Sequence, residues 1–508
     1  MQFLRVCRIC LQPHVQRGRV MQQQFSSGNS IKYAKNLSSK LVTPGVQFQL
    51  RNIHISNAFR WVKQQRLYSS SSLYTPTSEG DHVPFILNPE IEFKRLFSDL
   101  SELERNVSAR GQKVNLTNLV SLWKELQLFE QDKICIEGEK SEVNKRSKQL
   151  NKSGQGTKEQ KDGLQQLGRT LRENLRQINK SIATLSDEFY PAALKLPNDL
   201  HPDVPRGSAP KVLETFGADK QEEGSADKSA GWTSNELVEE SLPTVHAGSA
   251  FLKHEAALME LALTQWASQE LIQQGFVPFS CPALFKSIAL EAIGLNPDSS
   301  NEIYAIETQE NVQYLTGASP MAFIAYYMMS VMEMEDLPYR GFTVGRSYDS
   351  LKDSDKFDGL HNNFQTQKVE LCGVCENSDI ASSALFTQFL RTATDLLVKL
   401  PLRYRLTSVP SAQLLPSMHL KYAIEVWIPN IAEFVEVGCV YSCTDYISRR
   451  VKMRYPAIPT QSASQSRQRN FLHTVHCTAL DTSVLLAALL PAQQVPDVLE
   501  RHMPQSLT

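Results

Sequence analysis

The clearest apolar pattern of the chain is a seven-residue repeat in its second hundred residues. One apolar residue stands at each repeat, which predicts a helix with a single apolar stripe. These residues are Leu122, Phe129, Ile136, Val143 and Leu150. The Gly-rich segment 153–156 predicts a break after that helix. A second stripe comprises Leu164, Leu167, Leu171, Leu175, Ile178, Ile182 and Leu185. Two such helices joined by a short turn predict an antiparallel helical hairpin, which we call the arm.

The segments that follow the arm differ from it in composition. Leu196–Asn198 and His201–Pro205 are rich in proline and predict an extended connector, and the polar, Gly- and Ser-rich residues 206–240 predict a mobile surface loop. Farther on, the apolar run Val484–Leu490 is only seven residues long, and Met321–Met332 is interrupted by polar residues. Both runs are typical of buried helices, so we expect no membrane span.

Composition separates the N-terminal segment from the rest of the chain. The first 78 residues contain eleven Lys or Arg and no Asp or Glu, which is typical of a mitochondrial transit peptide. An arginine stands three residues before Ser69, a spacing that suggests cleavage after Tyr68. We therefore predict a transit peptide over 1–68, a flexible segment over 69–89 and a location in the mitochondrial matrix. The alternative is a basic arm that binds nucleic acid.

The full chain of 508 residues has a net charge of −1, and removal of residues 1–68 leaves 42 Lys or Arg against 54 Asp or Glu, a net charge of −12. Contact with nucleic acid must then come from a local patch. Residues 140–180 contain eleven Lys or Arg and only four Asp or Glu. This surplus of positive charge favours contact with RNA phosphates. A solvated coiled-coil face is the alternative. The predicted RNA-binding residues are Lys145, Arg146, Lys148, Lys152, Lys158 and Lys161.

Residues 342–370 resemble the second signature of class II aminoacyl-tRNA synthetases, and of seryl-tRNA synthetases in particular. That signature runs F-R-x-E, then a loop, then G-L-x-R-x-H-Q-F-x-K-x-E. Arg346 and Glu370 match it, whereas Tyr348, Asn362 and Phe364 stand at the positions of a glutamate, an arginine and a histidine. The polar residues that the family uses on ATP are therefore largely replaced.

Three further signatures resemble the same family with similar losses. The family's L-x-G-T-x-E has Ala318 and Pro320 at its threonine and glutamate. In E-x-x-S-x-S-N-x-x-D-F-Q-x-R-R, Glu436 is kept and Ser442 replaces the asparagine. In H-T-L-N-G-S-x-x-A-x-x-R, Val484 replaces the last arginine.

The resemblance spans about residues 90 to 495 and implies an α+β fold. We expect an antiparallel class II sheet flanked by helices over 241–508, the arm over 90–195, and the connector and loop over 196–240. The family uses this arm on tRNA, and its members pair through a first signature that Leu258, Leu261 and Pro282 match. The resemblance is strongest to degenerate mitochondrial paralogues of this family in insects. ATP and magnesium binding are predicted to be lost or weak.

The sequence predicts a pseudoenzyme of the serine–tRNA ligase family. It would bind tRNA or another structured RNA and pair with the authentic mitochondrial seryl-tRNA synthetase or with itself. Two alternatives remain open: an active mitochondrial serine–tRNA ligase with an atypical site, and a fold repurposed for another nucleotide reaction through His361, His476 and Cys477. No metal site is predicted, because the cysteines of the C-x-x-C at Cys372 point to opposite faces if that segment is a strand.

Overall fold

The computed structural model describes residues 71–74, 87, 89–153, 157–217, 237–240, 249–297, 303–307, 312–348, 359–456, 469–492 and 494–503. The chain divides into two compact units, Met1–Ser69 and Ser70–Thr508. The predicted transit peptide and its cleavage site lie outside the described residues, so both stay predictions. Within the part of the chain that is described, no helix combines the length and the apolar character that crossing a membrane requires.

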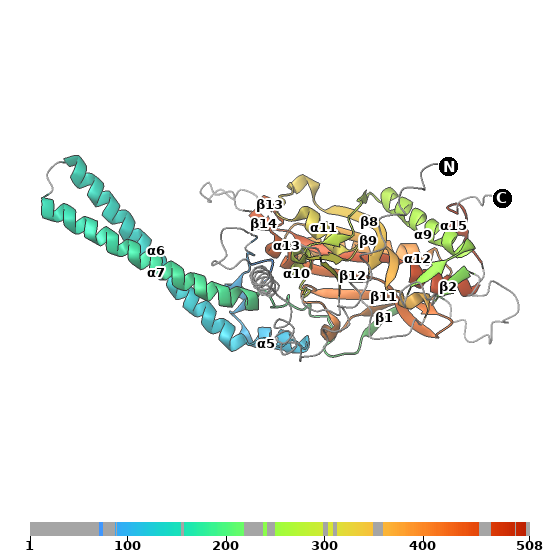
Figure 1. The fold of residues 1–508 in the computed structure, drawn as a ribbon. Helices are drawn as coiled ribbons and strands as arrows, with labels where there is room; N and C mark the ends of the chain where they lie inside the picture. Colours follow the sequence, from blue (N-terminus) through green and yellow to red (C-terminus); the bar gives the residue numbers. More distant parts are fainter. Residues whose placement is uncertain are drawn as a thin grey trace, which may run out of the picture. The chain divides into compact units, whose positions relative to one another are not determined.

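The arm is a pair of long helices that lie side by side, as predicted (Figure 1). Helix α6 spans Leu116–Ser153 and α7 spans Lys158–Ala193. Thr157 starts α7 with a capping box, in which its hydroxyl accepts from the Gln160 N–H and the Gln160 side chain accepts from the Thr157 N–H. Two shorter helices precede the pair, α4 (Phe93–Leu96) and α5 (Leu100–Ala109).

One position of the predicted second stripe was wrong. Leu167 is 46% exposed, and the adjacent Gly168 faces α6 instead, where a Cβ on Gly168 would lie 3.9 Å from Val143 Cγ1. The pattern misled because a glycine at a helix–helix contact carries no apolar side chain. At the base of the arm the stripes merge into a small core around Phe189, Leu119, Leu126 and Phe93.

The remainder of the second unit is built on an eight-stranded sheet with the order β1-β10-β11-β12-β15-β9-β8-β4. All neighbours are antiparallel except β4 and β8, which are parallel. The strands are β1 (Lys211–Phe216), β4 (Val277–Pro278), β8 (Tyr339–Tyr348), β9 (Gln365–Cys375), β10 (Tyr404–Ser408), β11 (Leu420–Ile428), β12 (Glu433–Thr444) and β15 (His473–Asp481).

Three small sheets accompany the large one. Their strands are β2 (Val238–Glu240) with β3 (Ala250–Leu252), β13 (Arg454–Pro456) with β14 (Arg469–Phe471), and β5 (Leu284–Phe285), β7 (Val312–Leu315) and β6 (Tyr304–Glu307). The α-helices are α9 (His254–Gln273), α10 (Ser287–Ala292), α11 (Pro320–Tyr327), α12 (Asp379–Val398), α13 (Tyr446–Val451), α14 (Thr482–Leu489) and α15 (Asp497–Glu500). Short 3-10 turns span Met334–Asp336 (η2), Leu360–Asn362 (η3), Ser411–Gln413 (η4) and Leu490–Ala492 (η5).

Helix α12 covers one face of the large sheet. Ser378 caps it by accepting from the Ala381 N–H, and Leu385, Phe389 and Leu396 form its buried stripe. A Cβ on Gly373 of β9 would lie 2.7 Å from Phe389 Cζ, so this glycine lets α12 approach the sheet closely.

Two predicted segment boundaries need correction. Residues 211–216, assigned to a mobile loop, form edge strand β1, because their backbone pairs with β10 although their side chains remain largely exposed. The segment 69–89, assigned as flexible, contains buried residues at Leu73, Tyr74 and Leu87. Neither segment has the periodic apolar pattern from which helices and strands are predicted, so both were missed in the sequence.

Candidate functional site

The six predicted RNA-binding cations all lie near the turn of the arm. Lys145, Arg146, Lys148 and Lys152 are exposed on the last turns of α6, and Lys158 and Lys161 are exposed on the first turns of α7. Among the described residues no carboxylate pairs with any of the six. Their charge is therefore available to a ligand such as the phosphates of RNA.

The second candidate site is the sheet face on which Glu370 and Glu436 lie, which we call the signature face. In an antiparallel sheet directly opposed residues share a face, and residues two apart along a strand return to it. Glu370 is opposite Thr478, which is opposite Cys439, and Cys439 is opposite Ala423. Glu436 is opposite Glu425, two residues beyond Ala423, so the two glutamates share this face.

The signature face is filled by side chains of the chain itself. Tyr441, His476 and Cys372 are directly opposed across three strands, two residues from the row that contains Glu370. They are 7%, 1% and 2% exposed, and the rings of Tyr441 and His476 stack with centroids 5.3 Å apart. Phe323 of α11 lies against the end of this row at Gly341. The row therefore leaves little space above the sheet for a substrate.

Burial also determines the protonation of this row. It lowers the pKa of His476 to about 4, so this side chain is neutral at physiological pH. Within the part of the chain that the structure describes, neither ring nitrogen of His476 has a hydrogen-bond partner. Burial raises the pKa of Tyr441 well above its usual value. A neutral histidine and a neutral phenol supply no positive charge to a phosphate.

Arg346 does not belong to the signature face, although its position in the sequence suggests that it does. It is opposite Gln367, three residues from Glu370 along β9, so its side chain points to the other face. There it forms a bidentate ion pair with Glu260 of α9, with N–O distances of 2.9 and 3.0 Å. Thr482 also donates to Glu260. The prediction that Arg346 is a vestigial active-site residue is therefore wrong, since strand alternation turns it away.

The residue that does face the signature side at this point is Gly345. A Cβ there would lie 3.3 Å from Ala318 Cβ. The loop of Ala318 lies against β8: Gly317 forms a bridge with Ser347, and the Ala318 N–H donates to the Arg346 carbonyl at 2.9 Å. A longer side chain at 345 would collide with this loop.

The acids of the signature face are held by groups of the protein. Lys421 contacts both carboxylate oxygens of Glu436, at 2.8 and 3.0 Å, and Thr478 donates to Glu370 at 2.8 Å. The ion pair with Glu436 helps to raise the pKa of Lys421 above its usual value, against the opposing effect of burial. A magnesium ion needs free carboxylate oxygens and substrate phosphates, and Glu436 is already neutralised. The residues present do not fit an ATP–magnesium site.

The other predicted positions serve local structure. Pro320 starts α11, and Tyr348 ends β8 with its N–H donating to the Thr316 carbonyl at 3.3 Å. Val484 is buried in α14, and Ser442 lies on the α12 face near Ser382. Asn362 is exposed in η3, and Phe364 packs edge-to-face on Tyr304.

Two of the predicted pairing residues, Leu258 and Leu261, lie on α9, and Pro282 lies between β4 and β5. Leu258 is partly buried, whereas Leu261 is 55% exposed and Pro282 is exposed. The exposed pair is available to a partner chain.

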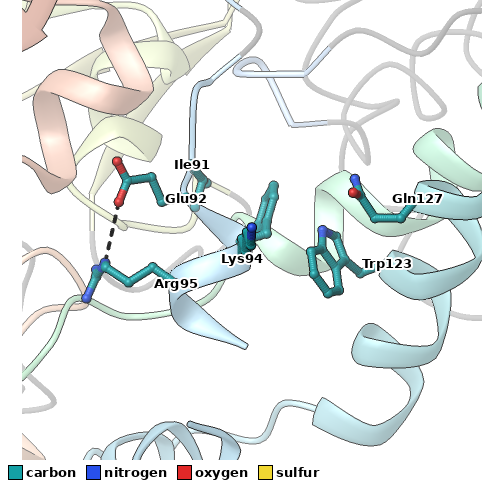
Figure 2. Close-up of a pocket in the computed structure, with 7 residues that line it drawn as sticks. Ile91, Glu92, Lys94, Arg95, Trp123 and Gln127 are labelled. Atoms are coloured by element: carbon teal, nitrogen blue, oxygen red, sulfur yellow. Dashed lines mark ion pairs between the residues drawn. The ribbon is translucent and has the colours of Figure 1, made fainter. Parts of the chain in front are cut away.

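Two cavities lie away from the signature face. A pocket of about 560 Å³ at the base of the arm is lined by residues of α4 and by Trp123 and Gln127 of α6, as Figure 2 shows. A cleft of about 1180 Å³ is lined by Ser442, Phe386 of α12 and part of the connector, residues 196–205. Within the described parts of the chain, no group of three or more His, Cys, Asp or Glu is placed to hold a metal ion.

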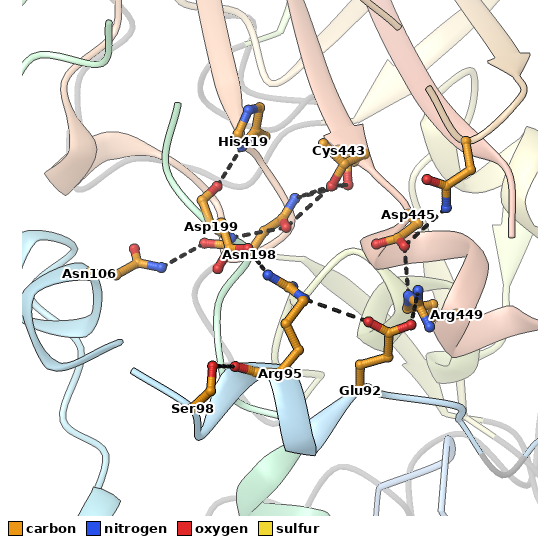
Figure 3. A network of polar contacts seen from close by, with 12 residues as sticks. Glu92, Arg95, Ser98, Asn106, Asn198, Asp199, His419, Cys443, Asp445 and Arg449 are labelled. Atoms are coloured by element: carbon orange, nitrogen blue, oxygen red, sulfur yellow. Dashed lines mark hydrogen bonds and ion pairs between the residues drawn. The ribbon is translucent and has the colours of Figure 1, made fainter. Parts of the chain in front are cut away.

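A polar network fastens the connector at this cleft (Figure 3). Asn198 donates to the Cys443 carbonyl at 2.8 Å and accepts from Asn106 of α5 at 2.9 Å through its own carbonyl. The Asp199 carboxylate pairs with Arg95 at 2.7 Å, and its carbonyl lies 2.7 Å from His419 Nδ1. The connector is therefore held to both the arm base and the sheet.

Known proteins with similar sequences agree with this architecture. The chain is 29% identical over 400 residues to the mitochondrial serine–tRNA ligase of Bos taurus, covering 75% of each chain. It is 26% identical over 430 residues to the serine–tRNA synthetase-like protein Slimp of Drosophila melanogaster, covering 83% of this chain and 88% of Slimp. The chain is therefore similar to seryl-tRNA synthetases over about three quarters of its length. No model of a known protein family matches it.

A solved structure confirms the class II fold. The seryl-tRNA synthetase of Pyrococcus horikoshii, crystallised with ATP, superposes with a TM-score of 0.70 at 19% identity and covers 81% of this chain and 98% of its own. The α+β fold with an antiparallel sheet and a long helical hairpin, predicted from the signatures, is thereby confirmed.

The signature that contains Glu436 includes two further replaced positions that lie on the signature face. The family pattern E-x-x-S-x-S-N places serines where this chain has Cys439 and Tyr441, and both residues lie on the signature face. Ser442, which attracted notice as the lost asparagine, lies on the opposite face. Strand parity applied to that pattern could have identified Tyr441. Nothing in the pattern pointed to Glu260.

Proposed function

We propose that this chain is a seryl-tRNA synthetase paralogue that has lost aminoacylation. It acts in the mitochondrial matrix as a non-catalytic RNA-binding or regulatory subunit that supports mitochondrial translation. The observation that carries the proposal is the signature face, which is filled by Tyr441 and His476 and whose carboxylates are held by protein groups.

Chemistry supports the loss of activity. Activation of an amino acid with ATP requires preorganised cations around the α-phosphoryl group, where negative charge develops. Two of the positions at which the family resemblance places arginines carry Asn362 and Val484, and the retained Arg346 lies on the opposite face of the sheet. Each lost charge-assisted hydrogen bond costs about 1.5–3 kcal/mol, so two losses reduce the rate by about 10²–10⁴.

RNA binding is assigned to the arm. Its six exposed cations lie on two adjoining helix ends, while the processed chain as a whole carries a net charge of −12. A positive patch on an acidic protein attracts phosphate and leaves the rest of the surface repulsive to RNA, which restricts binding to the arm. The ligand is tRNA or another structured RNA.

Pairing is assigned to α9 and its surroundings. The exposed Leu261 and Pro282, next to the partly buried Leu258, mark the surface. The partner is the authentic mitochondrial seryl-tRNA synthetase, in a heterodimer, or a second copy of this chain. The heterodimer would let one subunit supply catalysis and the other RNA binding or regulation.

Affinity capture from mitochondria, followed by native mass measurement of the intact complex, tests the pairing. The proposal predicts one copy of this chain with one copy of the authentic synthetase, or two copies of this chain. Leu261→Glu should release the partner, whereas Leu128→Glu, at another exposed leucine on α6, should not. A strictly monomeric protein would contradict the pairing.

Direct titration with ATP, alone and with magnesium and serine, tests the lost site. No saturable binding at millimolar ATP is expected, with the authentic synthetase as the positive control. The alternative of an active serine–tRNA ligase with an atypical site requires binding in this titration, and so does a fold repurposed for another reaction of ATP.

A further inference from the structure

The N-terminal end of the second unit is seated on two helices that belong to different parts of the fold. Ser71 donates through its hydroxyl to Glu291 Oε2 at 2.5 Å, and the Ser72 N–H donates to Glu291 Oε1 at 2.8 Å. The hydroxyls of Ser72 and Ser287 are also hydrogen-bonded. Glu291 and Ser287 both lie on α10, so the two serines hold the segment to this helix.

Of the next two residues, Leu73 is buried in the main core and Tyr74 contacts the arm. Leu73 is 2% exposed and Tyr74 is 8% exposed. The Tyr74 hydroxyl donates to Asp187 Oδ1 at 2.8 Å, and its ring stacks on Tyr190 with centroids 5.0 Å apart. Asp187 and Tyr190 lie on the last turns of α7. Four consecutive residues therefore bridge α10 and the base of the arm.

Glu291 has the features of a binding residue for this segment. Its carboxylate is partly buried, and both of its oxygens accept hydrogen bonds from Ser71 and Ser72. Burial raises its pKa, and hydrogen bonds from the segment oppose that rise. No lysine or arginine pairs with it among the described residues. Without the segment, a partly desolvated carboxylate would lose these donors, which is unfavourable.

We propose that α10 and α7 together form a docking site for residues 71–74, which act as a strap between the sheet domain and the arm. A second consequence concerns processing and rests on the predicted transit peptide. Because Ser71 contributes to the strap, we expect maturation to cut the chain before Ser71.

The strap and the connector network hold the arm base at two separate points. The network fixes Asn198 and Asp199, whereas the strap fixes Asp187 and Tyr190 of α7. With one of two attachments removed, the arm base opens more often, because local opening reflects the number of buried contacts that must break. The connector should then become accessible to a protease.

Limited trypsin digestion of the full-length protein tests the strap, with cleavage after Lys195 and Arg206 followed by mass measurement. Tyr74→Ala and Glu291→Gln should each speed these cleavages about tenfold and lower Tm by about 5 °C. Tyr74→Phe keeps the stacked ring and should give a smaller change. Glu188→Gln, at an exposed acid on the same end of α7, is the matched control and should change neither.

A chain that begins at Thr75 provides a second readout that does not depend on any substitution. Compared with a chain that begins at Ser69, it should show the same faster cleavage and lower Tm. Equal digestion rates and equal Tm for the two chains would overturn the strap. The intact mass of the mature protein from mitochondria should place its first residue at or before Ser71. A mature chain that begins after Tyr74 would overturn both parts of the proposal.

Discussion

The tip of the arm and the signature face of the sheet use charged side chains in opposite ways. At the tip, six cations are exposed and no described carboxylate pairs with them. On the sheet, Lys421 is bound to Glu436, and on the opposite face Arg346 is bound to Glu260. The same types of side chain are therefore available to a ligand in one region and already paired within the fold in the other.

This difference shows why counting retained residues is a poor guide to activity. Glu370 and Glu436 match the family signatures. However, Glu370 accepts a hydrogen bond from Thr478, and Glu436 forms an ion pair with Lys421. A residue contributes to a site only when its orientation and its charge are both available. By that criterion the charges of the arm are available to a ligand, whereas those of the signature face are engaged within the fold.

The largest effect is expected where the signature face is filled. Tyr441→Ser restores the residue of the family pattern but removes a buried ring, and should lower the free energy of unfolding by about 3–5 kcal/mol. Tyr441→Phe keeps the ring and should cost less than about 1.5 kcal/mol. Chemical denaturation measures both. If Tyr441→Ser leaves the free energy of unfolding unchanged, the signature face is not filled by this ring. The contrast between the arm and the signature face would then be wrong.

The next effect concerns the arm. Replacement of Lys145, Arg146, Lys148 and Lys152 by glutamate should weaken RNA binding by about 100-fold near 0.15 M salt and reduce the salt slope by about 3 to 4. The matched control changes four exposed lysines elsewhere, Lys94, Lys113, Lys124 and Lys195, to glutamate. Filter binding across a salt series measures both. Equal losses in the two variants would show that only net charge matters.

A third effect depends on pH. The pKa of His476 is about 4 in the folded protein and 6.5 in the unfolded chain, so the unfolded state binds more protons between these values. Stability is complete above pH 6.5 and falls as pH decreases toward 4, by about 2 kcal/mol at pH 5. His476→Phe should remove this part of the acid sensitivity. His419 and His473, whose pKa values are also lowered, should preserve the rest. Unfolding curves at pH 5 and 7.5 measure the free energy of unfolding of both proteins. If the difference between the two pH values is the same in His476→Phe as in the unmodified protein, His476 is not a neutral, buried side chain.

The smallest effect concerns the arginine on the opposite face. Arg346→Ala should lower stability by about 1 kcal/mol, because it leaves the mostly buried Glu260 without its partner. A double-mutant cycle with Glu260→Ala should recover a coupling of the same size. If Arg346→Ala instead changes nucleotide binding and leaves stability intact, Arg346 belongs to a working site.

The arm could be predicted from sequence because its information is local. The heptad stripe predicted the buried face of α6, and Gly154 and Gly156 predicted a helix break, in agreement with the end of α6 at Ser153. The prediction that Leu167 faces α6 was wrong because Gly168, which has no side chain, lies at the contact between the two helices. Strand β1 and the strap at Leu73 and Tyr74 escaped notice, since each depends on partners more than 100 residues away.

The sheet was predictable from the order of its signatures, but its chemistry was predictable only in part. The losses at Asn362 and Val484 are visible in the sequence alone. The orientation of Arg346 required the register of β8 and β9, and the ion pair with Glu260 required the position of α9. Tyr441 is decisive because of the face on which it lies, which the type of residue does not reveal.

Serine-dependent exchange of pyrophosphate with ATP tests the central claim most directly. The assay uses the purified chain with the authentic mitochondrial synthetase as reference, and with the two mixed as a further sample. We expect the chain alone to show no serine-dependent exchange above background, because a filled signature face cannot hold ATP and serine together. Exchange within tenfold of the authentic enzyme would contradict the account.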